Sequence, residues 1–520
     1  MSAIIGNQVS SDLELSTIHK NIPIQTKWGQ DLFYKQLMDC STSPNAIKKK
    51  QLPLLVLHTE STIRKNIQSH IHSLQSNIEF IDDCFDKTDQ RIQELISQIL
   101  WKPAGIGAFL NTSPFILNTF ISWKTLVLPG FAIFMPILMF IIPFFLQRII
   151  EPNIEVSDYL EQVKAVVLKQ ITVPTILKSR SPTDRIGFFL ESLFIGLTLA
   201  MFISSLWNQI TSSLHLRTIW FDLDMRGSTI QNLRNSVKYI TEELRKIPIH
   251  KQRGIRSLIE EGEQAIEQTK KMDDLDNVST FGLIWNNPTE IIPLKTWIGK
   301  LDVLSSIASL QNICYPTMKK TLGINIKNVI HPSLTSCVKN SIDISNHIII
   351  TGPNRGGKST FCKTLGISIM TAQSWGFAWA ESMSFRPFHS IVTVLEPCGK
   401  LGIESTFEAE IEFAKSVLAS TKQPIFVMMD EIFHSTNAID GFSASQVFLK
   451  RLYKKLDVVS VISTHYIQLA DSFQETAKAY QLITHEREDT TLEYTYQIAP
   501  GVSNKSSVME ILRERGLLEA

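Results

Sequence analysis

The sequence "HIIITGPNRGGKST", residues 347–360, contains the residue types of a phosphate-binding loop. Its three isoleucines, 348–350, predict a buried strand, and the segment that follows fits the pattern G-x-x-x-x-G-K-[ST]. In such a loop the glycines let backbone N–H groups converge on phosphate oxygens, with the positive end of a helix behind them. Lys358 would reach the β- and γ-phosphates, and the Ser359 hydroxyl would ligate Mg²⁺. We therefore expect a nucleotide site made by Gly352, Pro353, Asn354, Arg355, Gly356, Gly357, Lys358, Ser359 and Thr360.

Two further strand ends carry side chains suited to nucleotide hydrolysis. A predicted strand, 424–429, ends in Asp430, which would hold the metal through water, and Glu431, which would orient or deprotonate the attacking water. A third strand delivers His465 at its carboxyl end, where ligands of open α/β sheets bind and where it would sense the γ-phosphate. A lone Asp-Glu pair is more often surface or capping chemistry, and a lone histidine is more often structural. The assignment therefore depends on all three elements occurring together.

The order and spacing of these segments resemble the ATPases of the MutS family, a branch of the ABC class. The resemblance rests on "TGPNRGGKST", "ESTFEAEIEFAKSVL", "DEIFHSTNAIDG" and "STHYIQLA", and it covers roughly residues 290–520. It implies an α/β ABC-type P-loop domain that hydrolyses ATP with Mg²⁺ and acts as a homodimer, or as a heterodimer with a related head. It also implies composite sites, in which Ser405 of one head approaches the γ-phosphate held by Lys358 of the other.

Several positions depart from the family pattern. Arg355 stands where the family has Met, and Ile403 stands where it has Gly. The family's Gly-Arg-Gly-Thr loop reads Phe-His-Ser-Thr here, at residues 433–436. Before residue 280 the Phe-x-Glu motif of mismatch readers occurs only at residues 189–191, inside an apolar run, so we expect no mismatch reading by the known route. This layout resembles the short membrane-associated MutS-like proteins.

Composition indicates a folded protein and says little about partners. Hydrophobic residues make up 44% of the 520 residues, which is enough for several cores. Lys and Arg number 51 against 50 Asp and Glu, so a nucleic-acid surface must be a local patch. The six cysteines are scattered, which indicates neither a zinc site nor a disulfide framework and favours a reducing compartment. The first residues lack the basic and apolar regions of a cleavable signal peptide.

Two apolar runs predict membrane association. Residues 126–146 carry no charge over 21 positions, and residues 186–207 form a second run. Trp123 and Trp207 flank the runs as interfacial anchors would. A buried helical pair in a large core remains the alternative. The segment between the runs, 147–185, has six Lys or Arg, which favours a cytosolic position for it. The ATP site must also face the cytosol, and two full spans cannot place both there. Re-entrant insertion therefore stays open beside a spanning hairpin.

Changes in hydrophobicity and charge along the chain suggest four parts. We expect a helical lever-like region over 1–104, an apolar insert over 105–221, a charged helical lever or clamp over 222–289, and the ATPase domain over 290–520. The third part contains a basic group, Lys251, Arg253 and Arg256, which is either a solvated face or a contact for the phosphate backbone of DNA. The fold class is thus an all-α lever-like region with an inserted apolar segment, followed by an α/β ATPase domain.

The expected function is ATP binding and hydrolysis coupled to binding of DNA or a DNA structure. The rival hypothesis is a membrane-tethered mechanochemical ATPase that moves a protein partner and binds no nucleic acid. A catalytically weak scaffold is disfavoured because Lys358, Asp430, Glu431 and His465 are all present.

Overall fold

The structure is a computed structural model that describes residues 2–84, 90–150, 152–161, 182–395, 406–420, 422–487 and 491–517, with only the helix and not the side chains described over 182–199. The chain divides into two compact units. Unit one comprises residues 1–75, 237–265 and 293–520, and unit two comprises 76–236 and 266–292. The division into four parts by hydrophobicity and charge stays a prediction.

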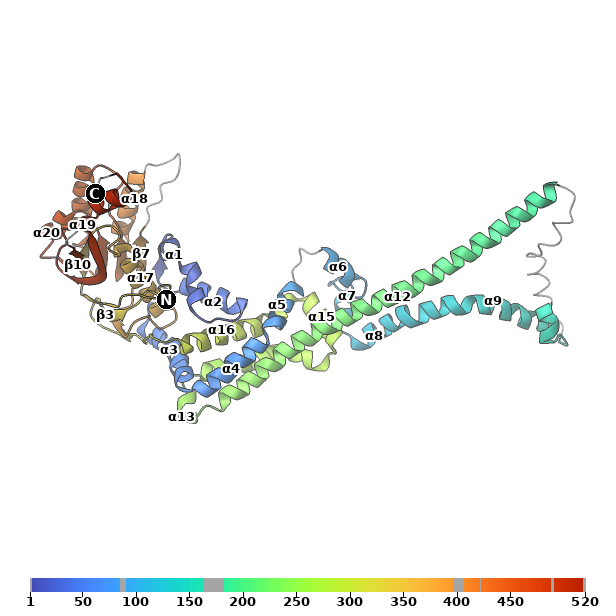
Figure 1. The fold of residues 1–520 in the computed structure, drawn as a ribbon. Helices are drawn as coiled ribbons and strands as arrows, with labels where there is room; N and C mark the ends of the chain where they lie inside the picture. The colour runs from blue at the N-terminus through green and yellow to red at the C-terminus, as the bar shows by residue number, and fades with distance from the viewer. Residues whose placement is uncertain are drawn as a thin grey trace. The chain divides into compact units, whose positions relative to one another are not determined.

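A seven-stranded sheet forms the centre of unit one (Figure 1). Its strand order is β1-β7-β8-β9-β5-β10-β11, and every neighbouring pair is parallel except β10 with β11. The strands are β1 (Ile4–Ile5), β5 (His347–Thr351), β7 (Ser390–Val394), β8 (Ile425–Met429), β9 (Val458–Ser463), β10 (Ala477–Glu486) and β11 (Leu492–Pro500). Strands β5, β8 and β9 are buried along their whole length, which is why their sequences are unbroken apolar runs.

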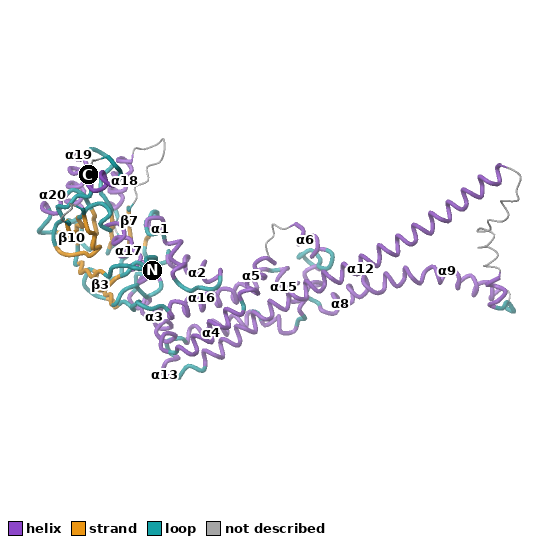
Figure 2. Tube along the Cα trace, viewed as in Figure 1, coloured by secondary structure: helices purple, strands orange, loops and turns teal. Residues whose placement is uncertain are grey.

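A second, four-stranded sheet also lies in unit one. Its order is β2-β6-β3-β4, with β3 antiparallel to both of its neighbours. The strands are β2 (Thr317–Met318), β3 (Ile324–Val329), β4 (Asn340–Ile344) and β6 (Ser382–Phe385). Figure 2 shows the strands as orange segments gathered in this unit.

Helices complete the core of unit one. They are α2 (Lys27–Leu37), α3 (Pro44–Thr59), α4 (Ser61–Ser73), α13 (Ile249–Gln252), α16 (Ile292–Ser309), α17 (Lys358–Ser374), α18 (Thr406–Ala419), α19 (Ala438–Leu452), α20 (Ile467–Ser472) and α21 (Val508–Glu514). One hydrophobic cluster joins Phe448 and Leu452 of α19 to Val427 of β8 and Ile462 of β9. Burial of these side chains fixes α19 on the sheet and positions the loop that precedes it.

The first residues of the chain belong to the sheet of unit one. Strand β1 pairs in parallel with β7, and the Thr393 hydroxyl donates to Asp12 Oδ2 at 2.6 Å. Lys363 of α17 pairs with Glu14 at 2.7 Å. The short helices α1 (Val9–Asp12) and η1 (Leu15–Asn21) follow the strand. We expected a helical lever-like region over 1–104 and did not expect β1, because a strand of two residues is too short to leave a periodic pattern in the sequence.

The regular elements among the described residues of unit two are all helices. The helices are α5 (Gln75–Cys84), α6 (Gln90–Ser97), α7 (Ile106–Asn111), α8 (Pro114–Ser122), η2 (Trp123–Val127), α9 (Leu128–Ile150), η3 (Lys270–Asp274), α15 (Asn277–Asn286) and η4 (Pro288–Ile291). The long α12 (Pro182–Arg245) and α14 (Arg256–Gln268) each run from one unit into the other. A buried amide ties α7 to α15, because Asn111 Nδ2 donates to Trp101 O at 2.8 Å and to Asn286 Oδ1 at 3.0 Å.

The apolar helices of unit two carry exposed side chains. Ser213 of α12 donates to Thr125 O at 2.7 Å. Beyond that contact Phe131 and Phe145 of α9 are 55% and 57% exposed, and Trp207 of α12 is 68% exposed. One helix of the described chain, Pro114–Phe134, is long and apolar enough to cross a membrane, and 17% of its most apolar stretch is buried. A core helix of a soluble protein can have the same length and composition, so this is weak evidence for a membrane span. Pro114–Phe134 overlaps the first predicted run, 126–146, while the side chains of 186–199 in the second run lie outside the description.

Candidate functional site

The phosphate loop lies between strand β5, an inner strand of the seven-stranded sheet, and helix α17. Backbone dihedral φ is positive at Gly352 (153°), Arg355 (68°) and Gly357 (96°), which turns the chain tightly before the helix begins at Lys358. A Cβ at Gly357 would lie 3.2 Å from the Tyr496 ring, a tight contact, and the positive φ there is one that glycine adopts without strain. The 17-residue helix α17 directs its positive end and its first unpaired N–H groups toward this loop.

Lys358 is held at the centre of the loop. Its side chain is 4% exposed, and its Nζ donates to Gly352 O at 3.0 Å and to Pro353 O at 3.3 Å. Burial lowers the pKa of the Lys358 ammonium, while the carboxylates of Glu431 and Asp430 act against that shift. The ammonium therefore lies among backbone carbonyls, at the position from which a lysine contacts bound phosphates.

Asp430 and Glu431 follow β8, beside the end of β9. Asp430 is 6% exposed, its amide donates to Val394 O at 2.9 Å, and the Ser463 hydroxyl donates to its Oδ1. The Glu431 amide donates to Ser463 O at 3.1 Å, and Glu431 itself has a positive φ of 50°, in the left-handed region that a non-glycine residue rarely adopts. This backbone turn directs the Glu431 side chain away from the strand axis.

His465 fixes the side chain of Glu431. His465 Nε2 donates to Glu431 Oε1 at 2.6 Å, with the two side chains 40% and 34% exposed. That hydrogen bond lowers the pKa of the Glu431 carboxyl, against the effect of burial. Glu431 is therefore a carboxylate at neutral pH, with one of its oxygens engaged by the imidazole.

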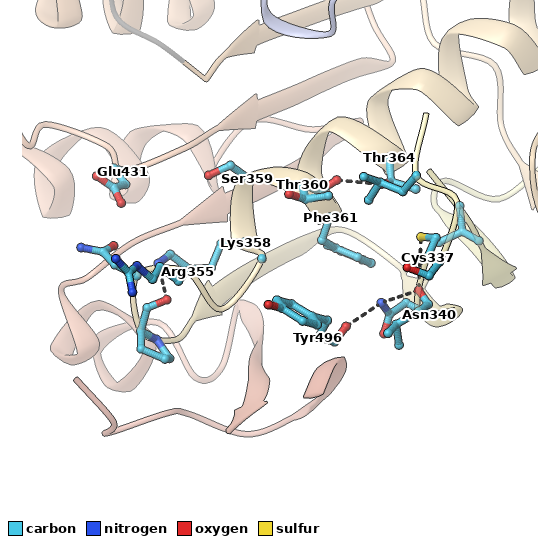
Figure 3. Close-up of a pocket in the computed structure, with 17 residues that line it drawn as sticks. Cys337, Asn340, Arg355, Lys358, Ser359, Thr360, Phe361, Thr364, Glu431 and Tyr496 are labelled. Atoms are coloured by element: carbon cyan, nitrogen blue, oxygen red, sulfur yellow. Dashed lines mark hydrogen bonds between the residues drawn. The ribbon is translucent and has the colours of Figure 1, made fainter. Parts of the chain in front are cut away.

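A cavity of about 350 Å³ joins the loop to these strand ends. Figure 3 shows Glu431, Arg355 and Lys358 at one end, Cys337 and Asn340 at the other, and the Tyr496 ring between them. Asn340 Nδ2 donates to Tyr496 O at 2.9 Å, which fastens β11 to β4 beside the cavity. The cavity thus has a cationic end and a less polar end of aromatic and aliphatic side chains.

The structure brings most of the expected site residues together. Those that line the cavity are Pro353, Asn354, Arg355, Gly357, Lys358, Ser359, Thr360 and Glu431. Gly352 and Gly356 lie in the loop behind its surface, Asp430 is buried beside it, and His465 reaches it through Glu431. Arg355 pairs with Glu514 of α21 at 2.5 Å. Ser405, expected to act on the other head, lies outside the described residues.

Other lining residues were not expected from the sequence. Val329 and Asn340 come from the four-stranded sheet, Tyr496 from β11, and Phe361 from α17. Val329, Asn340 and Tyr496 belong to elements outside the loop motif, and Phe361 follows the motif directly but is not part of its pattern. The positive φ of Tyr496, 56°, is the one local peculiarity, and a sequence does not reveal it.

The donor set fits a magnesium ion held mainly by phosphates and water. Mg²⁺ usually takes one or two protein oxygens and keeps several waters. Ser359 is exposed at the start of α17, and Asp430 has one carboxylate oxygen engaged by Ser463. In the part of the chain that the structure describes, no group of three or more His, Cys, Asp or Glu side chains forms a metal cluster. A site built from Ser359 and Asp430 would therefore need the nucleotide to complete it.

The basic group of α13 and α14 is partly neutralised. Lys251 Nζ pairs with Glu60 at 2.7 Å, and Arg256 pairs with Glu260 at 2.8 Å. Arg253 is exposed, and no ion pair is recorded for it among the described residues. Two of the three cations expected to contact DNA are thus occupied by carboxylates.

Residues 348–519 match the family model of MutS domain V. The DNA mismatch repair protein MutS of Shouchella clausii (strain KSM-K16) is 26% identical over 314 residues, which cover 56% of this chain and 34% of that protein. The match therefore spans about one third of the length of this curated relative. The family match begins in the strand that leads into the phosphate loop and runs past Glu431 and His465, so the C-terminal part of the chain is similar to MutS domain V.

Proposed function

We propose that the chain binds and hydrolyses ATP in the cavity of its MutS-type domain. The observation that carries this proposal is that Lys358, Ser359 and Glu431, from two different strand ends, line one cavity. Lys358 and the N–H groups of the loop would hold the phosphates, and the less polar end beside Tyr496 would receive the base. Magnesium, when bound, would supply positive charge at the phosphate oxygens.

Glu431 is the residue that would activate the attacking water. His465 engages Oε1 and thereby orients the carboxylate, and the lowered pKa keeps Glu431 ionised at neutral pH. The matched experiment measures phosphate release from Mg-ATP by the full-length protein and by Lys358→Ala. Hydrolysis by the wild type that is lost in the variant supports the proposal, and equal release by both proteins would exclude it.

The heads would act as a dimer with composite sites. This follows from the MutS relationship and from Ser405, which precedes α18. The dimer would be a homodimer, or a heterodimer with a related head. Light scattering of Glu431→Gln with ATP and with ADP tests this: the dimer should form with ATP and open or dissociate with ADP.

Coupling of ATP hydrolysis to DNA is proposed from the relative, whose name is DNA mismatch repair protein MutS. The surface for it is modest, because Lys251 and Arg256 already pair with carboxylates and Arg253 is the exposed cation of the group. We therefore expect phosphate-backbone contacts of low salt dependence and no discrimination of mismatches.

The second candidate function is a membrane-tethered ATPase that acts on a protein partner, with its head facing the cytosol. The exposed aromatic side chains of α9 and α12 favour this candidate, because a monomeric soluble protein rarely exposes a large group of apolar side chains to water. Flotation with phosphatidylcholine vesicles separates the candidates. Full-length protein should float, and a Phe131→Asp, Phe145→Asp variant should float less; recovery of both proteins at the bottom of the gradient would exclude the tethered form. Protease access to 147–185 in sealed vesicles would then distinguish a spanning hairpin from re-entrant insertion.

A further inference from the structure

A buried carboxylate on α18 contacts the loop that carries Glu431. The side chain of Glu410 is 4% exposed, although its neighbours Glu408 and Glu412 belong to a mixed-charge helix. Ser435 Oγ donates to Glu410 Oε2 at 2.6 Å, and His434 Nδ1 lies 3.4 Å from Glu410 Oε1. A buried carboxylate is costly unless hydrogen bonds satisfy it, and both of these contacts come from the loop after β8.

The same histidine holds the backbone of Glu431. His434 Nδ1 lies 2.8 Å from Glu431 O, and because a carbonyl oxygen only accepts, Nδ1 must carry the proton. The proton of Nδ1 is thus directed at the Glu431 carbonyl with the Glu410 carboxylate beside it. Glu410 therefore acts on the peptide that determines where the Glu431 side chain points.

This loop needs such support because its backbone is strained. Glu431 and Phe433 have φ of 50° and 52°, a region that non-glycine residues occupy at a cost in free energy and keep only where their surroundings hold them. Tyr466 contributes, since its hydroxyl donates to Phe433 O at 3.3 Å. Without the contacts of Glu410, the loop could relax toward ordinary dihedrals and turn the Glu431 carboxylate away from the cavity.

We propose that Glu410 is a positioning residue for Glu431, acting through His434 and Ser435. The inference rests on the proposed ATPase function. Because α18 begins at Thr406, the residue after Ser405, the helix that would carry Ser405 to the partner's ATP also holds this head's own Glu431 loop. Movement of α18 on dimer formation would therefore reach the hydrolytic carboxylate of the same head, which links the two sites of the dimer.

The test compares Glu410→Ala, Glu410→Gln and Ser435→Ala with the wild type in the full-length protein. The control is Glu412→Ala, because Glu412 is on the same helix but is 60% exposed and pairs with Lys415. The readouts are kcat, the Kd of a fluorescent ATP analogue, and Tm. We expect Glu410→Ala to lower kcat about 10- to 100-fold, as small misplacements of a catalytic group do. The Kd should change less than about twofold, because Lys358 is untouched. A twofold difference in Kd is about the smallest that such a comparison resolves.

The two milder variants keep the inference testable should Glu410→Ala fail to fold. Glu410→Gln retains an oxygen that can accept from Ser435, so its kcat should lie between those of wild type and Glu410→Ala. Wild-type kcat in both Glu410→Gln and Ser435→Ala would overturn the positioning role, as would a parallel loss of kcat and nucleotide affinity. A wild-type protein that binds ATP without hydrolysing it would instead overturn the proposed function, and this inference with it.

Discussion

Replacement of Glu431 by glutamine should separate catalysis from nucleotide binding. The amide has nearly the same size as the carboxylate, and its oxygen can still accept from His465 Nε2, which lies 2.6 Å from Glu431 Oε1. It cannot take a proton from water. Lys358 and Ser359 also line the cavity and remain in place, so ATP should still bind.

The magnitudes of the two effects differ enough to be told apart. Removal of a general base lowers a rate by about 10²–10⁴, which is about 2.7–5.5 kcal/mol of activation free energy at about 1.4 kcal/mol per factor of ten. The Glu431 and His465 side chains are 34% and 40% exposed, so loss of their contact should change stability by only about 0.2–1 kcal/mol. A rate effect of the expected size therefore cannot result from unfolding.

The assay is single-turnover hydrolysis at saturating Mg-ATP, beside a titration with labelled ATP and a thermal melt. Glu431→Gln should lose at least about 100-fold in the single-turnover rate with nucleotide affinity and Tm close to wild type. Glu412→Gln, on the exposed side of α18, is the control for loss of a carboxylate in general. A wild-type single-turnover rate in Glu431→Gln would refute the assignment of this carboxylate as the base.

Three further outcomes follow from the geometry. Lys358→Ala should abolish binding of labelled ATP while circular dichroism stays unchanged, because the loss is local to the phosphate loop; retained affinity would contradict the role of Lys358. The pKa of Glu431 is lowered from its ordinary 4.5, chiefly by the hydrogen bond from His465. The contribution of this carboxylate to stability is therefore complete above pH 4.5 and is lost as the pH falls through the lower pKa of the folded state. The Tm difference between wild type and Glu431→Gln should shrink as the pH falls through that lower pKa. If DNA binds through the basic group, Arg253 alone should give a log–log salt slope of about −0.9, whereas about −2.7 would mean that Lys251 and Arg256 leave their carboxylates.

The phosphate loop and the strand-end acids could be predicted because their chemistry is written in consecutive residues. A buried strand, a glycine turn and a lysine suffice for the loop, and parallel strands bring their carboxyl ends to one edge of the sheet. The partnership of Glu431 with His465 follows from the adjacency of β8 and β9. From the sequence we expected His465 to sense the γ-phosphate and did not predict that partnership.

Residues that act through long-range contacts could not be predicted in this way. Tyr496 and Asn340 reach the cavity from two strands that carry no phosphate pattern. Glu410 stands in a charged helical segment, where a glutamate is normally solvated, and only the fold shows that it is buried. The strand β1 has two residues, and its partner is β7.

The pairing of β1 with β7 has a consequence for the order in which the chain is made. Ile4 is translated long before its partner Ser390, and at about 5–20 residues per second the interval between them is of order 20–80 s. During that time the apolar segment around Ile4 and Ile5 has no strand to join, and the carboxylate of Asp12 has no Thr393 hydroxyl. Strand β1 therefore stays unpaired until most of the chain has been made. A bulky fusion placed before Ile4 would interfere with this pairing, so tags are better tested at both ends before an inactive preparation is attributed to the ATP site.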